Sequence, residues 1–223
     1  MKIGRYLLSI VMSVIVIALM STGAIAQSNP PSTSGATSGT GTISAPFISF
    51  KNFPDRVFSV TEYTRAMQKG GHNLLIWRDS WADLSQYDSV KVTDFSGRLL
   101  PYQDVFSYDQ FITVFNSAFR SSLKLSQTNA PNALLIEGAI VECNPGSRAM
   151  RAATLGWGGG RAAGAVVCEV FEPGKSQPCI RIYTRDTASF GGWGGNSIAL
   201  LNNIFTEVAM RLAATLNTQL STK

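Results

Sequence analysis

Two apolar segments joined by a short polar turn constrain the fold of this chain most strongly. Residues 163–172, AGAVVCEVFE, and residues 179–186, CIRIYTRD, are separated by PGKSQP. Runs of this length and composition on either side of a turn are typical of two antiparallel strands. The chain therefore contains a sheet built around this strand pair.

The register of the pair has two alternatives, because a shift by one residue exchanges the faces of a strand. One register sets Cys168 opposite Cys179 and permits a cross-strand disulfide. The other sets Glu169 opposite Arg181, and the hydrophobic pattern favours it. It gathers five residues on one face: Val166, Cys168, Val170, Ile180 and Ile182. A Cys168–Cys179 disulfide stays open, against the alternative that these thiols and Cys143 are all buried and inert.

Three further segments resemble strands, at residues 73–79, 88–95 and 132–143. In the last, Gly138 marks a bulge or a close contact. Apolar residues at helical spacing predict a helix over residues 107–125, which Ser107 and Gln110 begin with capping-box spacing. A final helix begins at Asn196 or Ser197. The apolar stripes of the two helices are Phe111, Phe115, Phe119 and Leu123, and Leu201, Phe205, Val208, Leu212 and Leu216.

This order of elements predicts an α+β fold. Strands that follow one another across short turns pair antiparallel, and two one-sided helices bury their stripes against one face of the sheet. We expect a two-layer sandwich, a mostly antiparallel sheet with two helices on one face.

The N-terminus has the pattern of an export signal. Lys2 and Arg5 precede an apolar run at residues 6–20, and Ala24 and Ala26 occupy A-x-A positions before Gln27. We therefore predict a signal peptide over residues 1–26, with a retained anchor as the alternative. Residues 27–45 are almost entirely small and polar, which predicts a flexible linker. A single domain follows over residues 46–223.

Composition argues against several classes of function. The net charge of +5 is spread along the chain without a basic stripe, which disfavours nucleic-acid binding. Three cysteines without a C-x-x-C pair, and one histidine, disfavour a zinc site, and we expect no cofactor. Gly158, Gly160 and Ala163 have a loose nucleotide-loop spacing, but the segment that follows resembles a strand rather than the required helix. The GKS at residues 174–176 is interpreted as a turn.

Catalytic residues are not evident. His72 lies in a glycine-rich segment, and a hydrolase of envelope polymers would pair it with Asp94 or Glu137. The carboxylates of Asp79, Asp83, Asp88 and Asp94 are interpreted as solvated or capping groups, with Asp83 at a turn or helix start.

A candidate contact patch surrounds two glycine-flanked tryptophans. TLGWGGGR and SFGGWGGNS border the ends of the strand pair, and antiparallel pairing sets them at the same edge of the sheet. Tryptophan suits a boundary between apolar and polar surroundings. The alternative is that both tryptophans cover an open end of the core. The patch comprises Trp157, Trp193, Phe190, Arg148, Arg151 and Arg161.

The chain resembles bacterial envelope lipoprotein families of unknown function over residues 53–216. One shared motif is a strand entry, here Ala82, Asp83, Leu84, Tyr87, Asp88, Val90 and Val92. The other is the turn at residues 145–151 after a long strand. More distantly, the order of elements resembles the curli-secretion lipoprotein and the N-terminal domain of TolB, a likeness of fold alone. The lipid-attachment cysteine of many relatives is missing from AIAQS.

The resemblance implies an exported, non-enzymatic protein that is periplasmic, attached to the outer membrane or secreted. We expect a binding or assembly module that contacts an envelope protein or a membrane surface and does not bind nucleic acid. Self-assembly into a homo-oligomer, including a ring or pore subunit, stays open.

Overall fold

In a computed structural model of the chain, the described residues are 48–101, 103, 107–146, 161–188 and 196–221. They belong to a compact unit of residues 44–223, and a second unit spans residues 1–43. The predicted signal segment and the whole predicted linker lie outside the described residues, so both stay predictions.

A seven-stranded sheet forms the centre of the domain. Its strands are β1 (Gln68–Gly71), β2 (Leu74–Arg78), β3 (Ser89–Val92), β4 (Ser126–Gln127), β5 (Leu134–Asn144), β6 (Ala162–Phe171) and β7 (Pro178–Ala188), in the spatial order β1-β2-β7-β6-β5-β3-β4. The four pairs β1–β2, β2–β7, β7–β6 and β6–β5 are antiparallel, whereas β3 is parallel to both of its neighbours, β5 and β4. The predicted α+β fold with a mostly antiparallel sheet is confirmed.

The β6–β7 register is the one that the hydrophobic pattern favours. Glu169 pairs with Arg181, and Cys168 pairs with Ile182 rather than with Cys179. The five residues expected on one face all belong to the same buried cluster. Residues 172–177 join the two strands in a turn, in which Gly174 has a φ of 73°, and Pro178 of the PGKSQP segment begins β7.

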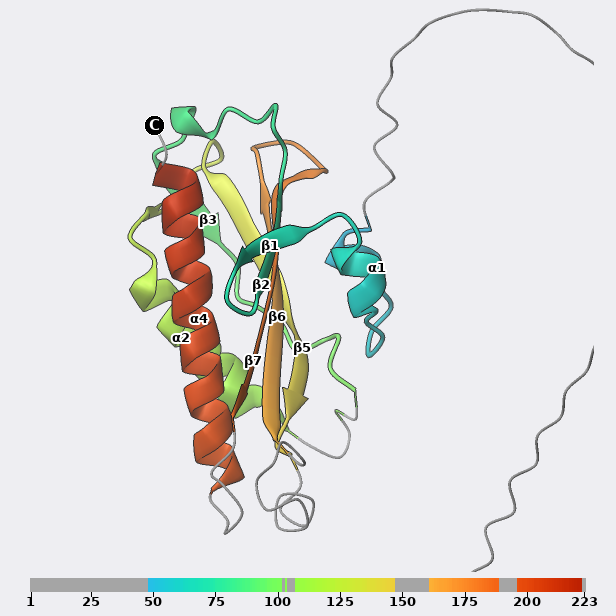
Figure 1. The fold of residues 1–223 in the computed structure, drawn as a ribbon. Coiled ribbons are helices and arrows are strands. Elements are labelled where there is room, and N and C mark those ends of the chain that lie inside the picture. The colour runs from blue at the N-terminus through green and yellow to red at the C-terminus, as the bar shows by residue number, and fades with distance from the viewer. Residues whose placement is uncertain (1–47, 102, 104–106, 147–160, 189–195, 222–223) are drawn as a thin grey trace, which may run out of the picture. The chain divides into compact units, whose positions relative to one another are not determined.

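Two helices pack on one face of the sheet, α2 (Asp109–Ser122) and α4 (Ser197–Ser221). Figure 1 shows them side by side, with the long α4 running along β6 and β7. Both predicted apolar stripes lie in the main core, where the phenylalanines of α2 contact one another, Phe95 and α4. This layer matches the sequence prediction.

The predicted cap is present at the start of α4 but not at the start of α2. Asn196 accepts a hydrogen bond from the Ile198 amide (3.0 Å), so the predicted cap of α4 is present. The capping box of α2 is not formed, because its N-cap is Tyr108. Ser107 instead donates its hydroxyl hydrogen to the carboxylate of Asp109 (3.0 Å) and accepts from the Asp109 amide (3.5 Å).

The opposite face of the sheet is covered by a segment that the sequence did not predict. Residues 48–64, which we call the strap, contain η1 (Phe50–Asn52) and α1 (Val60–Thr64). In Figure 1 the strap lies across the sheet from α2 and α4. It forms a second buried cluster with the sheet, whose members are Phe50, Phe53, Tyr63, Leu99, Ala139, Val141, Ala165, Val167 and Tyr183.

Gly138 lies at a close contact rather than at a bulge. A Cβ at this position would come within 2.0 Å of the Phe95 ring and 2.4 Å of the Val167 carbonyl oxygen. The irregularity of β5 falls between Ile140 and Glu142. Only glycine allows the Phe95 ring to lie directly against the strand.

Candidate functional site

A buried ion pair joins the sheet to the strap. Glu169 on β6 and Arg181 on β7 are 0% and 1% exposed, and Arg181 Nε lies 3.7 Å from Glu169 Oε1. The Glu169 carboxylate accepts hydrogen bonds from the Ser49 hydroxyl (2.6 Å) and the Phe50 amide (3.0 Å). Every one of these partners belongs to the sheet or the strap, so the pair fastens the first described residues of the strap to the sheet.

Arg181 binds the strap through its backbone. Its Nη2 donates to the carbonyl oxygens of Ile48 and Tyr63, each at 2.8 Å, and its guanidinium lies 4.4 Å from the centre of the Tyr63 ring. Arg98 makes similar bonds to the carbonyl oxygens of Phe50 (2.8 Å) and Phe53 (2.9 Å). The two arginines hold both ends of the strap to the rest of the domain.

Burial dominates the electrostatics of this cluster. It raises the pKa of Glu169, although hydrogen bonds from Ser49 and Phe50 and the charge of Arg181 act in the opposite direction. Burial also raises the pKa of the Tyr63 hydroxyl, and the nearby Glu169 carboxylate adds to this effect. A shifted carboxyl can indicate a catalytic acid. Here the group is closed off by the strap, and its role is structural.

The proposed hydrolase residues are not brought together. His72 is exposed in the turn between β1 and β2, at one edge of the sheet. Glu137 is on β5, three strand spacings from β2, which is roughly 14 Å. Asp94 follows β3, one strand farther away. A general base must come within hydrogen-bond reach of its partner, so this combination cannot act as one catalytic site.

Both carboxylates instead have structural partners. Glu137 forms an ion pair with Lys51 of the strap, and the Lys51 ammonium lies 4.5 Å from the centre of the Phe171 ring. Asp94 accepts two hydrogen bonds from Arg120 of α2, at 2.7 and 3.2 Å.

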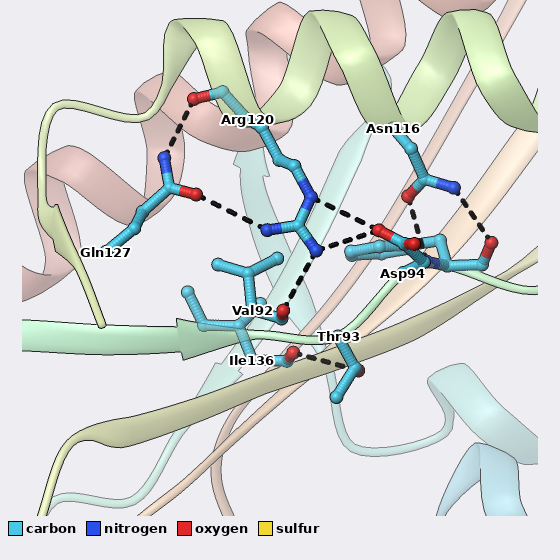
Figure 2. A network of polar contacts seen from close by, with 8 residues as sticks. Val92, Thr93, Asp94, Asn116, Arg120, Gln127 and Ile136 are labelled. Carbon is cyan, nitrogen blue, oxygen red and sulfur yellow. Dashed lines mark hydrogen bonds and ion pairs between the residues drawn. The ribbon is translucent and has the colours of Figure 1, made fainter. Parts of the chain in front are cut away.

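Figure 2 shows the network around Asp94. The Arg120 guanidinium also donates to the Val92 carbonyl oxygen (2.9 Å) and contacts Gln127, so it links α2 to the exit of β3 and to β4. One turn away, the Asn116 amide group exchanges hydrogen bonds with the backbone of Phe95, at 2.8 and 3.1 Å. These contacts fix the parallel edge of the sheet against α2.

The remaining aspartates of this region shape the chain locally. Asp79 accepts a hydrogen bond from the Trp81 amide (3.0 Å). Asp83 caps η2 (Leu84–Gln86) by accepting from the Ser85 amide (3.1 Å) and hydroxyl (2.7 Å). These bonds lower the pKa of Asp83. The predicted turn or helix-start role of Asp83 is confirmed.

The three cysteines are buried free thiols. The Cys168–Cys179 disulfide is not formed, because the register sets Cys168 opposite Ile182. Burial raises the pKa of Cys143 and of Cys179 to about 12, and that of Cys168 also rises. Thiols with such pKa values stay protonated and react slowly.

The tryptophan patch falls mostly outside the described residues. Of its six members, only Arg161 is described; it is exposed and donates to the Thr187 carbonyl oxygen at 3.4 Å. The others, Arg148, Arg151, Trp157, Phe190 and Trp193, lie in the undescribed ranges 147–160 and 189–195. The described flanks of both ranges are informative: Ala162 pairs with Ala188, and Asn144 pairs with Ala163.

Sequence reasoning missed an exposed tryptophan elsewhere. Trp81 is 93% exposed, in the loop between β2 and η2. It directly precedes the strand-entry motif that begins at Ala82. No local pattern signals its exposure, because the alternation of the flanking strand ends at Arg78.

Other features of the described residues add no chemistry. A groove of about 490 Å³ lies at the start of α2, beside Arg98 and Tyr108. Within the described ranges, histidine, cysteine and carboxylate side chains form no group of three that could hold a metal ion. None of the described helices has the length and apolar character needed to cross a membrane.

Comparisons with known proteins identify no family. No family model and no curated protein matches the chain. A PelC variant that forms a dodecamer, from Paraburkholderia phytofirmans, has a TM-score of 0.41 and 14% identity, covering 67% of this chain and 99% of its own. A minor lipoprotein from Acinetobacter baumannii has a TM-score of 0.34 and 9% identity, and the match covers 60% of this chain and 92% of the lipoprotein. A Xanthomonas campestris protein of the DUF330 family has a TM-score of 0.38 and 9% identity, and the match covers 64% of this chain and 91% of that protein. Likeness at this level supports no conclusion about function.

Proposed function

We propose that this chain is an exported, non-enzymatic module that binds or assembles in the bacterial envelope. The N-terminal pattern supports export, and the linker gives the domain reach. Its contact surface would be the sheet end bearing the two glycine-flanked tryptophans. Arg148, Arg151 and Arg161 would supply positive charge beside Trp157, Trp193 and Phe190.

The pairing of Ala162 with Ala188 is the observation that carries this proposal. Residue 161 precedes β6 and residue 189 follows β7, so both glycine-rich segments adjoin the same end of the sheet. The pairing of Asn144 with Ala163 adds the segment after β5. Residues from three parts of the sequence would thus contribute to one surface. The separation of His72 from Asp94 and Glu137 argues against the hydrolase alternative.

Tryptophan fluorescence tests the proposal. Residues 27–223 are purified, and iodide quenching is measured alone, with phosphatidylglycerol vesicles and with envelope extract. We expect Trp157 and Trp193 to be quenched in the free protein and protected by vesicles or by extract. The Trp157→Phe/Trp193→Phe variant should lose the part of the tryptophan fluorescence that vesicles or extract protect from iodide, which we call the protected component. Protection by vesicles alone would indicate a lipid surface, and protection only by extract would indicate an envelope partner.

Trp81→Phe provides a matched control. Trp81 follows β2, whose last residue Arg78 pairs with Ile180 near the start of β7. It therefore lies at the opposite end of β7 from Ala188, the last described residue before the second glycine-flanked tryptophan. Removing it should leave the protected component unchanged. If Trp157 and Trp193 are shielded from iodide in the free protein, they cover the core and the proposed surface is wrong.

A further inference from the structure

Trp81 is the most exposed large hydrophobic residue among those described, at 93%. Tryptophan side chains are usually largely buried, and those at interfaces often contribute much of the binding energy. Residues 79–88, which we call the Trp81 turn, present this indole at one end of the sheet.

The Trp81 turn is tied to the core on both sides of the indole. The Asp79 amide donates to the Cys179 carbonyl oxygen (2.9 Å), and the Asp79 side chain accepts from the Trp81 amide (3.0 Å). After the tryptophan, Asp83 caps η2 and Leu84 is buried. An anchor held in place before binding loses little conformational entropy when a partner covers it.

The charge of the Trp81 turn is opposite to that of the chain. Asp79, Asp83 and Asp88 fall within ten residues that include no lysine, arginine or histidine, whereas the whole chain has a net charge of +5. The hydrogen bonds that Ser85 donates lower the pKa of Asp83 and keep it ionised. A partner for this turn should therefore present an apolar spot bordered by positive charge.

The outer side of the strap has this chemistry. Val57 and Val60 are 53% and 43% exposed, and Arg65 and Lys69 follow them with exposed side chains. Lys69 pairs with Leu75, which packs in the strap's cluster, so Lys69 is on the strap's side of the sheet. We call Val57, Val60, Arg65 and Lys69 the strap surface.

Charge over the whole segment supports this assignment. Residues 48–71 contain four basic residues and two acidic ones. Lys51 is paired with Glu137 and Asp55 with Arg98 (3.1 Å), and the other charged residues are Arg56, Arg65 and Lys69 against Glu62. The strap surface is thus an apolar spot with a positive border on the same chain that carries the acidic, aromatic turn.

We propose that the Trp81 turn of one copy of this chain docks on the strap surface of a second copy. The indole would cover Val57 and Val60, and the carboxylates of the turn would face Arg65 and Lys69. A single contact of this kind joins two different surfaces and leaves one free surface of each kind on a pair of chains. This inference does not depend on the contact surface proposed at the other end of the sheet.

Complementation between two defective variants tests the proposal. Trp81→Ala removes the anchor, and Val57→Asp/Val60→Asp disrupts the strap surface. Analytical ultracentrifugation of residues 27–223 at about 100 μM, where even micromolar contacts are populated, should show association of the wild type and monomers of each variant. An equimolar mixture of the variants should form a 1:1 dimer, because each supplies the surface that the other lacks.

Controls distinguish loss of this contact from misfolding, and specific association from non-specific hydrophobic association. All six side chains changed in the variants and controls are exposed, and circular dichroism should show unchanged melting. Ile198→Asp/Met210→Asp changes two other exposed apolar residues, both on α4, and should leave association intact. Arg65→Glu should weaken association without changing the fold.

Three results would overturn the proposal: a monomeric wild type at this concentration, association that survives Trp81→Ala, or two monomeric variants that fail to form a dimer when mixed. The last would indicate a contact between identical surfaces. None of these measurements contains lipid or extract, so failure here leaves the fluorescence test of the proposed function unaffected.

Discussion

Glu169 on β6 lies directly opposite Arg181 on β7, and both side chains are buried beneath the strap. The pair satisfies backbone groups of Ile48, Phe50 and Tyr63. It therefore connects the centre of the sheet to the first described residues of the chain.

Removing one member of this pair should destabilise the domain strongly. Glu169→Ala leaves Arg181 as an uncompensated buried charge, which typically costs about 3–5 kcal/mol. Urea unfolding measures the change. Asp94→Asn is the matched control, because its ion pair with Arg120 is exposed and such pairs contribute about 0–1 kcal/mol. Equal losses in the two variants would contradict a special role for the buried pair.

The raised pKa of Glu169 predicts a pH dependence. Between the ordinary value of 4.5 and the raised pKa of the folded state, Glu169 is protonated when folded and ionised when unfolded. Folding then binds a proton, so the free energy of unfolding decreases as pH rises through this window. Unfolding curves of wild type and Glu169→Gln across this range should show that the variant lacks this decrease. Parallel curves would show that Glu169 does not titrate in this way.

All three thiols should be unreactive in the folded protein. With pKa values raised to about 12 at Cys143 and Cys179, little thiolate exists at pH 8. A thiol reagent such as DTNB should therefore label the native protein slowly and label three groups once guanidinium unfolds it without a reductant. One labelled group after unfolding would instead reveal a disulfide in the exported protein.

Gly138→Ala should destabilise the domain, because the new methyl group would overlap the Phe95 ring and the Val167 carbonyl oxygen. Overpacking of this kind costs about 1–3 kcal/mol or more. Gly71→Ala is the control, since a Cβ there meets nothing within 4 Å. Melting temperatures distinguish the two, and an unchanged value for Gly138→Ala would mean that Phe95 has room to move.

The candidate sites show where prediction from sequence stopped. The roles of Asp83 and Asn196 follow from short local patterns, and both were predicted. The partners of Asp94 and Glu137 were not, because Arg120 and Lys51 are distant in sequence and are brought close only by packing. The exposure of Trp81 likewise depends on how surrounding elements pack.

The sequence by itself predicted five of the seven strands, the helices α2 and α4 and the α+β class, and it favoured the β6–β7 register that is observed. Alternation with period two assigns each strand residue to a face, and only one register places all five apolar residues on the same side. The tertiary structure alone decided that β3 pairs in parallel with β5 and that the strap covers the second face. Both rest on contacts between segments far apart in the chain, and no local periodicity records which distant partner a segment will bury.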